Sequence, residues 1–319
     1  MRYLVTGAAG FIGSHLVESL CRSGHEVIAV DCFTDYYDPE AKRDNARIVE
    51  RASSLSIDER DLASAPLDDL LAGVDAIIHL AGQPGVRLSW SEHFALYISQ
   101  NLLTTQRLLE GAVRGGVKRL ILASSSSVYG EADRYPTDEH SATRPFSPYG
   151  VSKLAAESLC RAYSANWGID TILLRYFTVY GPRQRPDMAM HRFIELALDG
   201  QPVPVFGDGQ QIRDFTFVND VVLATVSAAT ADLAGSTVIN VAGGSSAPLS
   251  TVLDLIGEST GRNVGVDRKP AQPGDVRVTG GDIALAGRLL NWSPKTSLSE
   301  GVTRQVAWHV DRRAHDRRR

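Results

Sequence analysis

A tyrosine and a lysine one helical turn apart follow a cluster of serines. Tyr149 and Lys153 stand in "SPYGVSKLAAE", and Ser124–Ser127 stand in "ASSSSVYG", directly after an apolar run. Because helical residues four apart share a face, the phenol and the ammonium should lie side by side. A free phenol ionises near pH ~10, and a neighbouring cation favours its phenolate, so the pair predicts a base that removes a proton from an alcohol. We expect a serine hydroxyl to relay that proton, although four serines would also suit a turn or a phosphate cradle.

A glycine-rich turn opens the chain. "TGAAGFIG" places Gly7, Gly10 and Gly13 between an apolar run and a helical pattern over residues 11–23. Such a turn lets backbone approach a pyrophosphate at a helix N-terminus. Asp31 ends the next apolar run, where a carboxylate accepts both ribose hydroxyls of NAD and repels the 2′-phosphate of NADP. The two features together predict an NAD site, although a plain tight turn or a strand-end aspartate would explain either alone.

The elements that must position these residues alternate along the chain. The apolar runs "YLVTG", "EVIAVD", "VDAIIHLAG", "VKRLILASS" and "IDTILLRYF" are separated by helical stretches, which predicts a doubly wound parallel sheet of the α/β class. Later in the chain, proline and glycine become frequent and the strands become short. We therefore expect a Rossmann domain over 1–180, which the chain rejoins near 214–245, a smaller substrate-binding lobe over 181–310, and a basic, disordered tail over 311–319.

Composition excludes several classes of function. The chain has 319 residues, a formal net charge of −4 and three cysteines without paired spacing. These values give no reason to expect nucleic acid or membrane as a partner, a metal site, or disulfides. The N-terminus lacks the layout of a signal peptide, so we expect a cytoplasmic enzyme.

Further motifs extend the pattern to residue 310 or so. Asn101 in "SQNLLTT", together with "RYFTVYGPR", "VFGDGQQIRDFTFVND" and "QPGDV", resembles the extended short-chain dehydrogenase/reductase family of sugar-nucleotide epimerases and dehydratases. The resemblance implies tightly held NAD, a nucleotide-diphosphate sugar in the C-terminal lobe, and a homodimer in which helices near 92–114 and 149–166 form a four-helix bundle. It also implies that Ser125, Tyr149 and Lys153 are the catalytic residues. The expected cofactor contacts are Gly7, Gly10, Phe11, Ile12, Gly13, Asp31, Lys42, Asp61, Leu62, Leu80, Ala81, Gly82, Asn101, Tyr149, Lys153 and Tyr176.

The residues before "VYG" separate the subfamilies. Dehydratases carry an Asp-Glu pair there, whereas this chain has Ser126 and Ser127, so elimination of water has no evident catalyst. The remaining chemistry is oxidation and re-reduction at C4 of the sugar, which is epimerisation.

Three segments point to the sugar. "DYYDPEAKRDNAR", "AGQPGVRLS" and "YFTVYGPRQRPDM" are similar to segments of UDP-glucuronate 4-epimerases, although Arg183-Gln184 and Pro84 depart from that pattern. The C6 carboxylate of glucuronate matches a planar guanidinium, for which Arg185 is the first candidate and Arg87 the second. The expected substrate contacts are Arg87, Ser125, Ser126, Ser127, Thr178, Arg185, Gln211, Arg213 and Asp275, with Arg213 on the diphosphate and Asp275 on the ribose.

Other activities stay open at this point. A UDP-glucose or UDP-N-acetylglucosamine 4-epimerase and a UDP-glucuronate decarboxylase would use the same three catalytic residues. A non-catalytic NAD-binding regulator is a more remote alternative.

Overall fold

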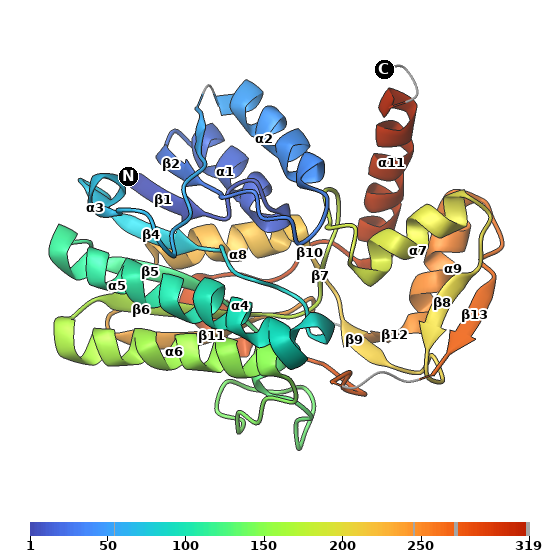
Figure 1. The fold of residues 1–319 in the computed structure, drawn as a ribbon. Helices are drawn as coiled ribbons and strands as arrows, with labels where there is room; N and C mark the ends of the chain where they lie inside the picture. The colour runs from blue at the N-terminus through green and yellow to red at the C-terminus, as the bar shows by residue number, and fades with distance from the viewer. Residues whose placement is uncertain (54, 245, 271–273, 317–319) are drawn as a thin grey trace.

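A seven-stranded parallel sheet forms the centre of the molecule (Figure 1). The computed structural model describes residues 1–53, 55–244, 246–270 and 274–316. Within them the strand order is β11-β6-β5-β4-β1-β2-β3, which confirms the expected doubly wound fold. The strands are β1 (Arg2–Thr6), β2 (Glu26–Val30), β3 (Ile57–Asp58), β4 (Ala76–His79), β5 (Arg119–Ser125), β6 (Asp170–Tyr176) and β11 (Ser236–Val241).

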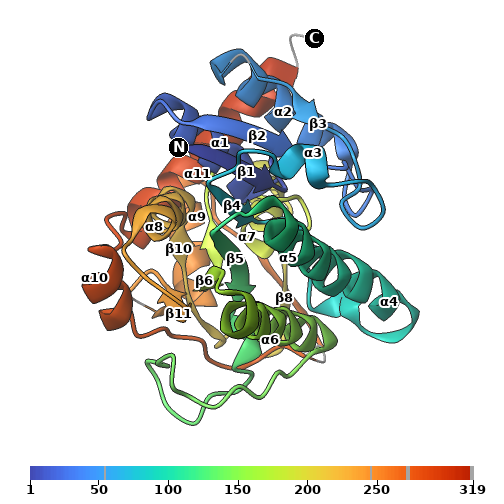
Figure 2. The ribbon, with the colours of Figure 1, turned by 90° about the vertical axis from the view of Figure 1, so that its left-hand side faces the viewer.

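Helices cover both faces of this sheet (Figure 2). Alternate strand residues enter two apolar cores, with Val5 in the one and Leu4 in the other. Leu16 of α1 and Ala224 of α8 belong to the first core, and Leu108 of α5 to the second. The helices around the sheet are α1 (Phe11–Arg22), α2 (Pro39–Ser53), α3 (Asp68–Leu71), α4 (Phe94–Tyr97), a π-helix (Ile98–Leu103), α5 (Thr104–Gly115), α6 (Pro148–Trp167) and α8 (Val218–Thr230).

The smaller lobe packs against the carboxyl side of the sheet. Its short strands pair as β8 with β13, β9 with β12, and β7 with β10. Phe193 and Val203 of this lobe share one apolar core with Val5, so the two parts are joined by packing and the boundaries expected from the sequence stay a prediction. The elements are β7 (Val179–Tyr180), α7 (Ala189–Leu198), β8 (Val203–Phe206), β9 (Ile212–Asp214), β10 (Thr216–Phe217), β12 (Ser246–Pro248), α9 (Leu249–Thr260), β13 (Val266–Lys269), α10 (Ala284–Leu290) and α11 (Leu298–Asp316).

The C-terminal helix continues further than expected. A disordered tail was expected over 311–319, but α11 extends to Asp316. Arg313 explains the difference, because its guanidinium donates to Glu195 at 2.9 Å and to Asp199 at 2.6 Å, both on or next to α7. The expectation is therefore wrong for 311–316, and residues 317–319 lie outside the described ranges. Among the described helices, none combines the length and apolarity of a membrane span.

Candidate active site

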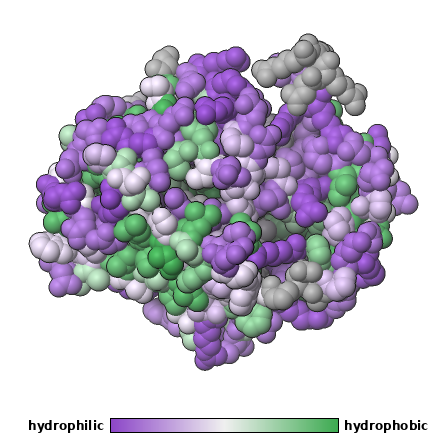
Figure 3. All heavy atoms as spheres, in the orientation of Figure 1, coloured by the Kyte–Doolittle hydropathy of each residue, from purple (hydrophilic) through white to green (hydrophobic). Residues whose placement is uncertain are grey.

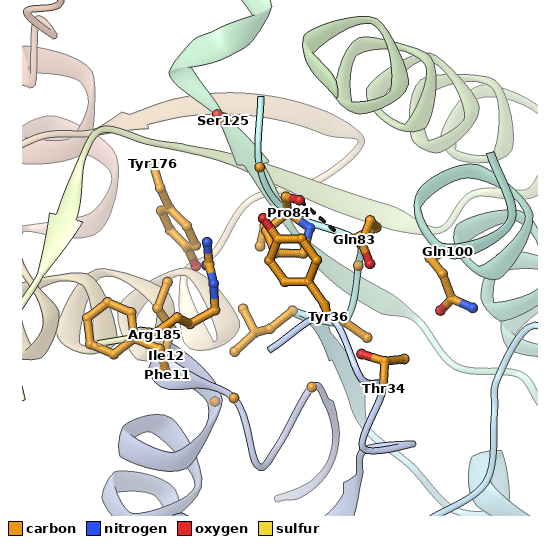
Figure 4. Close-up of a pocket in the computed structure, with 18 of the residues that line it drawn as sticks. Phe11, Ile12, Thr34, Tyr36, Gln83, Pro84, Gln100, Ser125, Tyr176 and Arg185 are labelled. Carbon is orange, nitrogen blue, oxygen red and sulfur yellow. Dashed lines mark hydrogen bonds between the residues drawn. The ribbon is translucent and has the colours of Figure 1, made fainter. Parts of the chain in front are cut away.

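A groove follows the carboxyl edge of the sheet, where β1, β2, β4, β5 and β6 end (Figure 4). Parallel strands bring residues far apart in sequence to this one edge, as is usual for ligand sites in open α/β sheets. Most of the residues predicted from the sequence line it. They are Gly7, Gly10, Phe11, Ile12, Gly13, Asp31, Lys42, Asp61, Leu62, Leu80, Ala81, Gly82, Ser125, Ser126, Ser127, Tyr149, Lys153, Tyr176, Thr178 and Arg185.

Helix α6 presents Tyr149 and Lys153 to this groove. The helix begins at Pro148, and the Ser147 hydroxyl caps it by accepting the Gly150 N–H at 3.2 Å. Lys153 Nζ donates to the carbonyl oxygen of Ala123 at 2.9 Å. Burial lowers the pKa of Lys153 to about 8, against the opposing effect of a nearby carboxylate. The hydrogen bond to Ala123 places the Lys153 ammonium at the end of β5, where the serine cluster begins.

The pKa of Tyr149 is raised by burial and lowered in part by the Ser125 hydroxyl and the Arg185 guanidinium. Ser125 lies at the end of β5, and its Oγ accepts the Ser127 N–H at 3.1 Å. The three predicted catalytic side chains thus meet in one wall of the groove. Because burial disfavours the phenolate, proton removal by Tyr149 requires positive charge beside the ring.

A buried ion pair lies directly behind these residues. Glu157, one turn beyond Lys153 on α6, is fully buried and accepts from Arg175 of β6 at 2.9 Å and 2.7 Å. Ser124 Oγ also donates to Glu157 at 2.6 Å. The pair therefore ties α6, β5 and β6 together beneath the catalytic side chains. The sequence reasoning missed Glu157, although its place one turn after Lys153 in "KLAAE" is a signal that could have identified it.

The glycine turn forms the opposite end of the groove. Gly7 has φ +70°, and a Cβ on Gly13 would lie 2.0 Å from the Gly7 carbonyl oxygen, so both positions require glycine. Asp31 is nearly buried and accepts hydrogen bonds from the Ala9 and Phe33 amides at 3.1 Å and 2.9 Å and from Lys42 at 2.9 Å. A turn without side chains, followed by a fixed carboxylate, fits the pyrophosphate and ribose of a dinucleotide.

Asn101 lies behind the wall of the groove rather than in it. Its Oδ1 accepts the Gln83 N–H at 2.6 Å, and its Nδ2 donates to Ser152 Oγ at 2.9 Å. A Cβ on Gly82 would lie 2.7 Å from that same Oδ1. Asn101 therefore braces the segment after β4 against α6, and its expected contact with the cofactor stays a prediction. The π-helix that carries it is typical of functional sites.

The two arginines after β7 point in different directions. Arg183 forms an ion pair with Glu18 of α1 at 2.8 Å and does not line the groove. Arg185 lines it, and Figure 4 shows its side chain extending into the groove on the side of Tyr176. Its Nε and Nη2 donate to Asp187 at 2.9 Å and 3.0 Å. Within the described ranges, Nη1 makes no hydrogen bond to protein, so that edge of the guanidinium is available to a ligand.

Tyr36 was not predicted as a site residue, yet it lines the groove near Arg185. Its hydroxyl donates to Asp187 Oδ2 at 3.4 Å. The pKa of Tyr36 is raised by burial and by Asp187, so the hydroxyl stays a donor. The aromatic pair in "DYYDP" is the signal that could have identified this contact.

Four predicted substrate contacts lie outside this groove. The Arg87 guanidinium lies 4.3 Å from the ring centroid of Phe206, which places the second carboxylate candidate against the smaller lobe. Gln211 Nε2 donates to the Phe206 carbonyl oxygen at 2.6 Å, and its buried Oε1 has no partner among the described residues. Arg213 and Asp275 form an ion pair with each other. None of the four side chains lines the groove that holds the catalytic residues.

A parallel sheet whose carboxyl edge carries Ser125, with Tyr149 and Lys153 presented from α6, is the arrangement of the short-chain dehydrogenase class. The chain belongs to the NAD dependent epimerase/dehydratase family, whose model matches residues 3–242. This confirms the expected family and its cofactor.

Similar proteins act on, or were solved with, related sugars. A UDP-glucuronic acid 4-epimerase from Bacillus cereus, solved with UDP-glucuronic acid and NAD, has a TM-score of 0.94 and 39% identity, and covers 98% of this chain and 99% of its own. MoeE5, solved with UDP-glucuronic acid and NAD, has a TM-score of 0.88 and 44% identity, with 98% and 100% covered; it was also solved with UDP-glucose and NAD. An uncharacterized UDP-glucose epimerase, YtcB of Bacillus subtilis (strain 168), is 43% identical over 97% of this chain and 98% of its own.

Proposed function

We propose that this protein is an NAD-dependent 4-epimerase of a UDP-sugar and that its preferred substrate is UDP-glucuronate, converted to UDP-galacturonate. The observation that carries the choice of sugar is the position of Arg185, which lines the same groove as Ser125 and Tyr149. A guanidinium beside a proton-transfer centre suits a sugar that carries a carboxylate.

The residues of the glycine turn and of Asp31 would hold NAD along the groove. Asp31 accepts the ribose hydroxyls, and the turn at Gly7 and Gly13 admits the pyrophosphate. Asp61 and Leu62 line the adenine end, while Tyr176 lines the groove near the catalytic residues. When bound, NAD supplies a hydride acceptor that takes the hydrogen from C4 of the sugar and returns it.

Tyr149 acts as the base for the sugar hydroxyl. It removes the proton of the C4 hydroxyl, through Ser125 or directly, as the hydride leaves the same carbon, and it gives the proton back on re-reduction. Lys153 would favour the phenolate that burial disfavours, and the positive charge of a bound nicotinamide would add to this effect. Inversion at C4 requires the 4-keto sugar to turn so that hydride returns to its other face.

Arg185 and Thr178 would hold the carboxylate. Oxidation at C4 of glucuronate gives a β-keto acid, which loses CO2 when the bond from C5 to the carboxyl carbon stands perpendicular to the carbonyl plane. Hydrogen bonds from Arg185, Thr178, Ser126 and Ser127 would keep that bond near the plane and so suppress decarboxylation.

The UDP group would lie toward the smaller lobe. Arg213 is the proposed diphosphate contact and Asp275 the ribose contact, which requires their mutual ion pair to open. The unpartnered Oε1 of Gln211 is an acceptor suited to a nucleoside N–H or hydroxyl. Arg87, whose guanidinium lies over the Phe206 ring, is the second cation on this side of the lobe.

UDP-glucose is the second candidate, on a specific observation. The charge of Arg185 is already balanced by Asp187, so a neutral sugar would not leave the Arg185 guanidinium unpaired. MoeE5, which is similar over the full chain, was solved with UDP-glucose as well as with UDP-glucuronic acid.

Incubation of the purified enzyme with UDP-glucuronate, UDP-glucose and UDP-N-acetylglucosamine separately tests the proposal. We expect the highest kcat/KM on UDP-glucuronate, with UDP-galacturonate as product by NMR. A higher kcat/KM on UDP-glucose would replace the proposed substrate with the second candidate, and release of a UDP-pentose with CO2 would show a decarboxylase.

We further propose a homodimer. Apolar side chains of the helical layer made by α4, the π-helix, α5 and α6 are exposed, and Figure 3 shows an apolar patch on this side of the molecule. Leu103 is 43% exposed and Val151 48% exposed, and a contiguous exposed apolar patch is typical of an interaction surface. A second copy would bury both in a four-helix arrangement. Leu103→Glu should shift the mass by light scattering from dimer to monomer, and a wild-type monomer would contradict the proposal.

A further inference from the structure

The loop 181–188 carries Arg185 into the groove and has an unusual backbone. Gly181 has φ +138° and Arg183, which is not glycine, has φ +64°. L-residues rarely adopt positive φ, so the surrounding structure must hold this loop in its conformation. Besides the Tyr36 contact to Asp187, buried contacts from outside the groove hold this loop.

Gln184, next to Arg185 in sequence, is the centre of these contacts. Its side chain is buried, with Nε2 donating to the Val179 carbonyl oxygen at 3.0 Å and Oε1 accepting the His191 N–H at 3.0 Å. The ring of His191 also hydrogen-bonds to the Gln184 carbonyl oxygen at 2.8 Å. One side chain therefore joins the end of β7 to the start of α7.

Gln305 of α11 completes the network. It is fully buried, its Nε2 donates to Gln184 Oε1 at 2.8 Å, and its Oε1 accepts the Gly181 N–H at 2.9 Å. The Gln305 amide thus contacts both the first residue of the loop and the residue before Arg185. An apolar side chain at this position would leave a buried N–H without a partner, and the loop would have to move to satisfy it.

Ion pairs anchor α11 itself. Arg313 pairs with Glu195 and Asp199, and His309 hydrogen-bonds to Glu195. Glu195, His309 and His191 lie close enough together to suggest a metal site, but the Glu195 carboxylate is already occupied by Arg313 and His309. We assign this cluster to the anchoring of α11 on α7. The helix can therefore act as a fixed support from which Gln305 reaches the loop.

We propose that Gln305, acting through Gln184, is a positioning residue for Arg185 and thereby helps select a sugar with a C6 carboxylate. The inference rests on the proposed function, because it assigns to Arg185 the carboxylate of UDP-glucuronate. Neither glutamine lines the catalytic groove, so their effect on the substrate passes through the loop.

Gln305→Leu tests this, with Val302→Ala as the matched control. Val302 is fully buried on the same helix, and its truncation weakens packing without touching the network. We expect Gln305→Leu to lower kcat/KM for UDP-glucuronate about tenfold, mainly through KM, and to change kcat/KM for UDP-glucose less than about twofold. Val302→Ala should lower Tm and leave the ratio of kcat/KM for UDP-glucuronate to kcat/KM for UDP-glucose as in the wild type.

A double-mutant cycle identifies the route of the effect. In the Arg185→Ala background, Gln305→Leu should cause no further change in the ratio, because the residue that it positions is gone. An equal loss on both sugars, or the same change in ratio with and without Arg185, would overturn the inference while leaving the proposed function intact. A wild-type enzyme without preference for UDP-glucuronate would overturn the proposed function first.

Gln305→Met serves if the leucine variant does not fold. It keeps the length of the side chain without burying a charge and loses both contacts to the loop, so we expect a change of similar size in the same direction. A wild-type ratio in this variant would also contradict the proposal.

Discussion

Beneath Tyr149 and Lys153 a buried ion pair joins α6 to β6, whereas beside Arg185 a neutral pair of amides joins the loop 181–188 to α11. Breaking a buried ion pair leaves an uncompensated charge, which costs about 3–5 kcal/mol, while loss of one neutral hydrogen bond costs about 1–3 kcal/mol if a partner stays buried. The catalytic residues Tyr149 and Lys153 therefore have the more rigid support. The sugar-selecting loop has a support that substitutions can alter without unfolding the sheet.

The largest effect is expected when the proton-transferring hydroxyl of Tyr149 is removed. Tyr149→Phe keeps the ring and loses the hydroxyl, so turnover should fall by about 10²-fold or more while NAD and UDP-sugar still bind. Stopped-flow or endpoint assays measure the turnover, and calorimetry measures the binding of NAD and UDP-sugar. A near-normal rate would remove Tyr149 from the mechanism.

A second substitution tests the ion pair itself. Glu157→Gln leaves the buried Arg175 guanidinium without its carboxylate, and we expect a loss of about 3 kcal/mol in the free energy of unfolding. Gln305→Leu should lose less than half as much. Urea unfolding of both variants makes the comparison directly, and equal losses would remove the distinction between the two supports.

The cofactor end offers a smaller effect. The wild-type enzyme should bind NAD more tightly than NADP, because the fixed carboxylate of Asp31 repels a 2′-phosphate. Asp31→Asn also frees Lys42 from its ion pair, so the preference should fall by about tenfold or more. Titration with both cofactors measures this, and equal affinities in the wild type would refute the role of Asp31.

The smallest effect concerns pH. Burial lowers the pKa of Lys153 to about 8, so above that pH the unfolded chain holds a proton at this residue that the folded chain has lost. Stability therefore rises with pH between about 8 and the ordinary lysine pKa, and the burial cost is fully present below about 8. Comparison with Lys153→Met at pH 7.5 and 9.0 should isolate roughly 1 kcal/mol, since each pH unit above the folded pKa contributes about 1.4 kcal/mol. No difference between the two proteins would show that Lys153 keeps its proton.

Local patterns explain how much the sequence could predict. The glycine turn, Asp31 and the pair Tyr149 and Lys153 lie within single βα units or one helical turn, so spacing alone placed them in the groove. The doubly wound parallel sheet follows from the alternation of apolar runs and helices, whereas the order of its strands is seen only in the structure.

The parts of the site that could not be predicted depend on contacts between residues far apart in sequence. Gln184 and Gln305 are 121 residues apart, and no local pattern indicates that they meet. The direction of Arg183 depends on its ion pair with Glu18 of α1, which is far away in sequence. The brace at Asn101 depends on the backbone of Gln83, which only the folded segment after β4 brings into reach.

The central claim is that Arg185 distinguishes a C6 carboxylate from a neutral CH2OH, and the kinetics of Arg185→Ala on UDP-glucuronate and UDP-glucose test it most directly. Charge-assisted hydrogen bonds of roughly 1.5–3 kcal/mol predict a fall in kcat/KM for UDP-glucuronate of about one to two orders of magnitude, with little change for UDP-glucose. Arg87→Ala, whose guanidinium lies over Phe206, should change the ratio less. An equal loss on both sugars in Arg185→Ala would contradict the claim and assign Arg185 to the diphosphate or to folding.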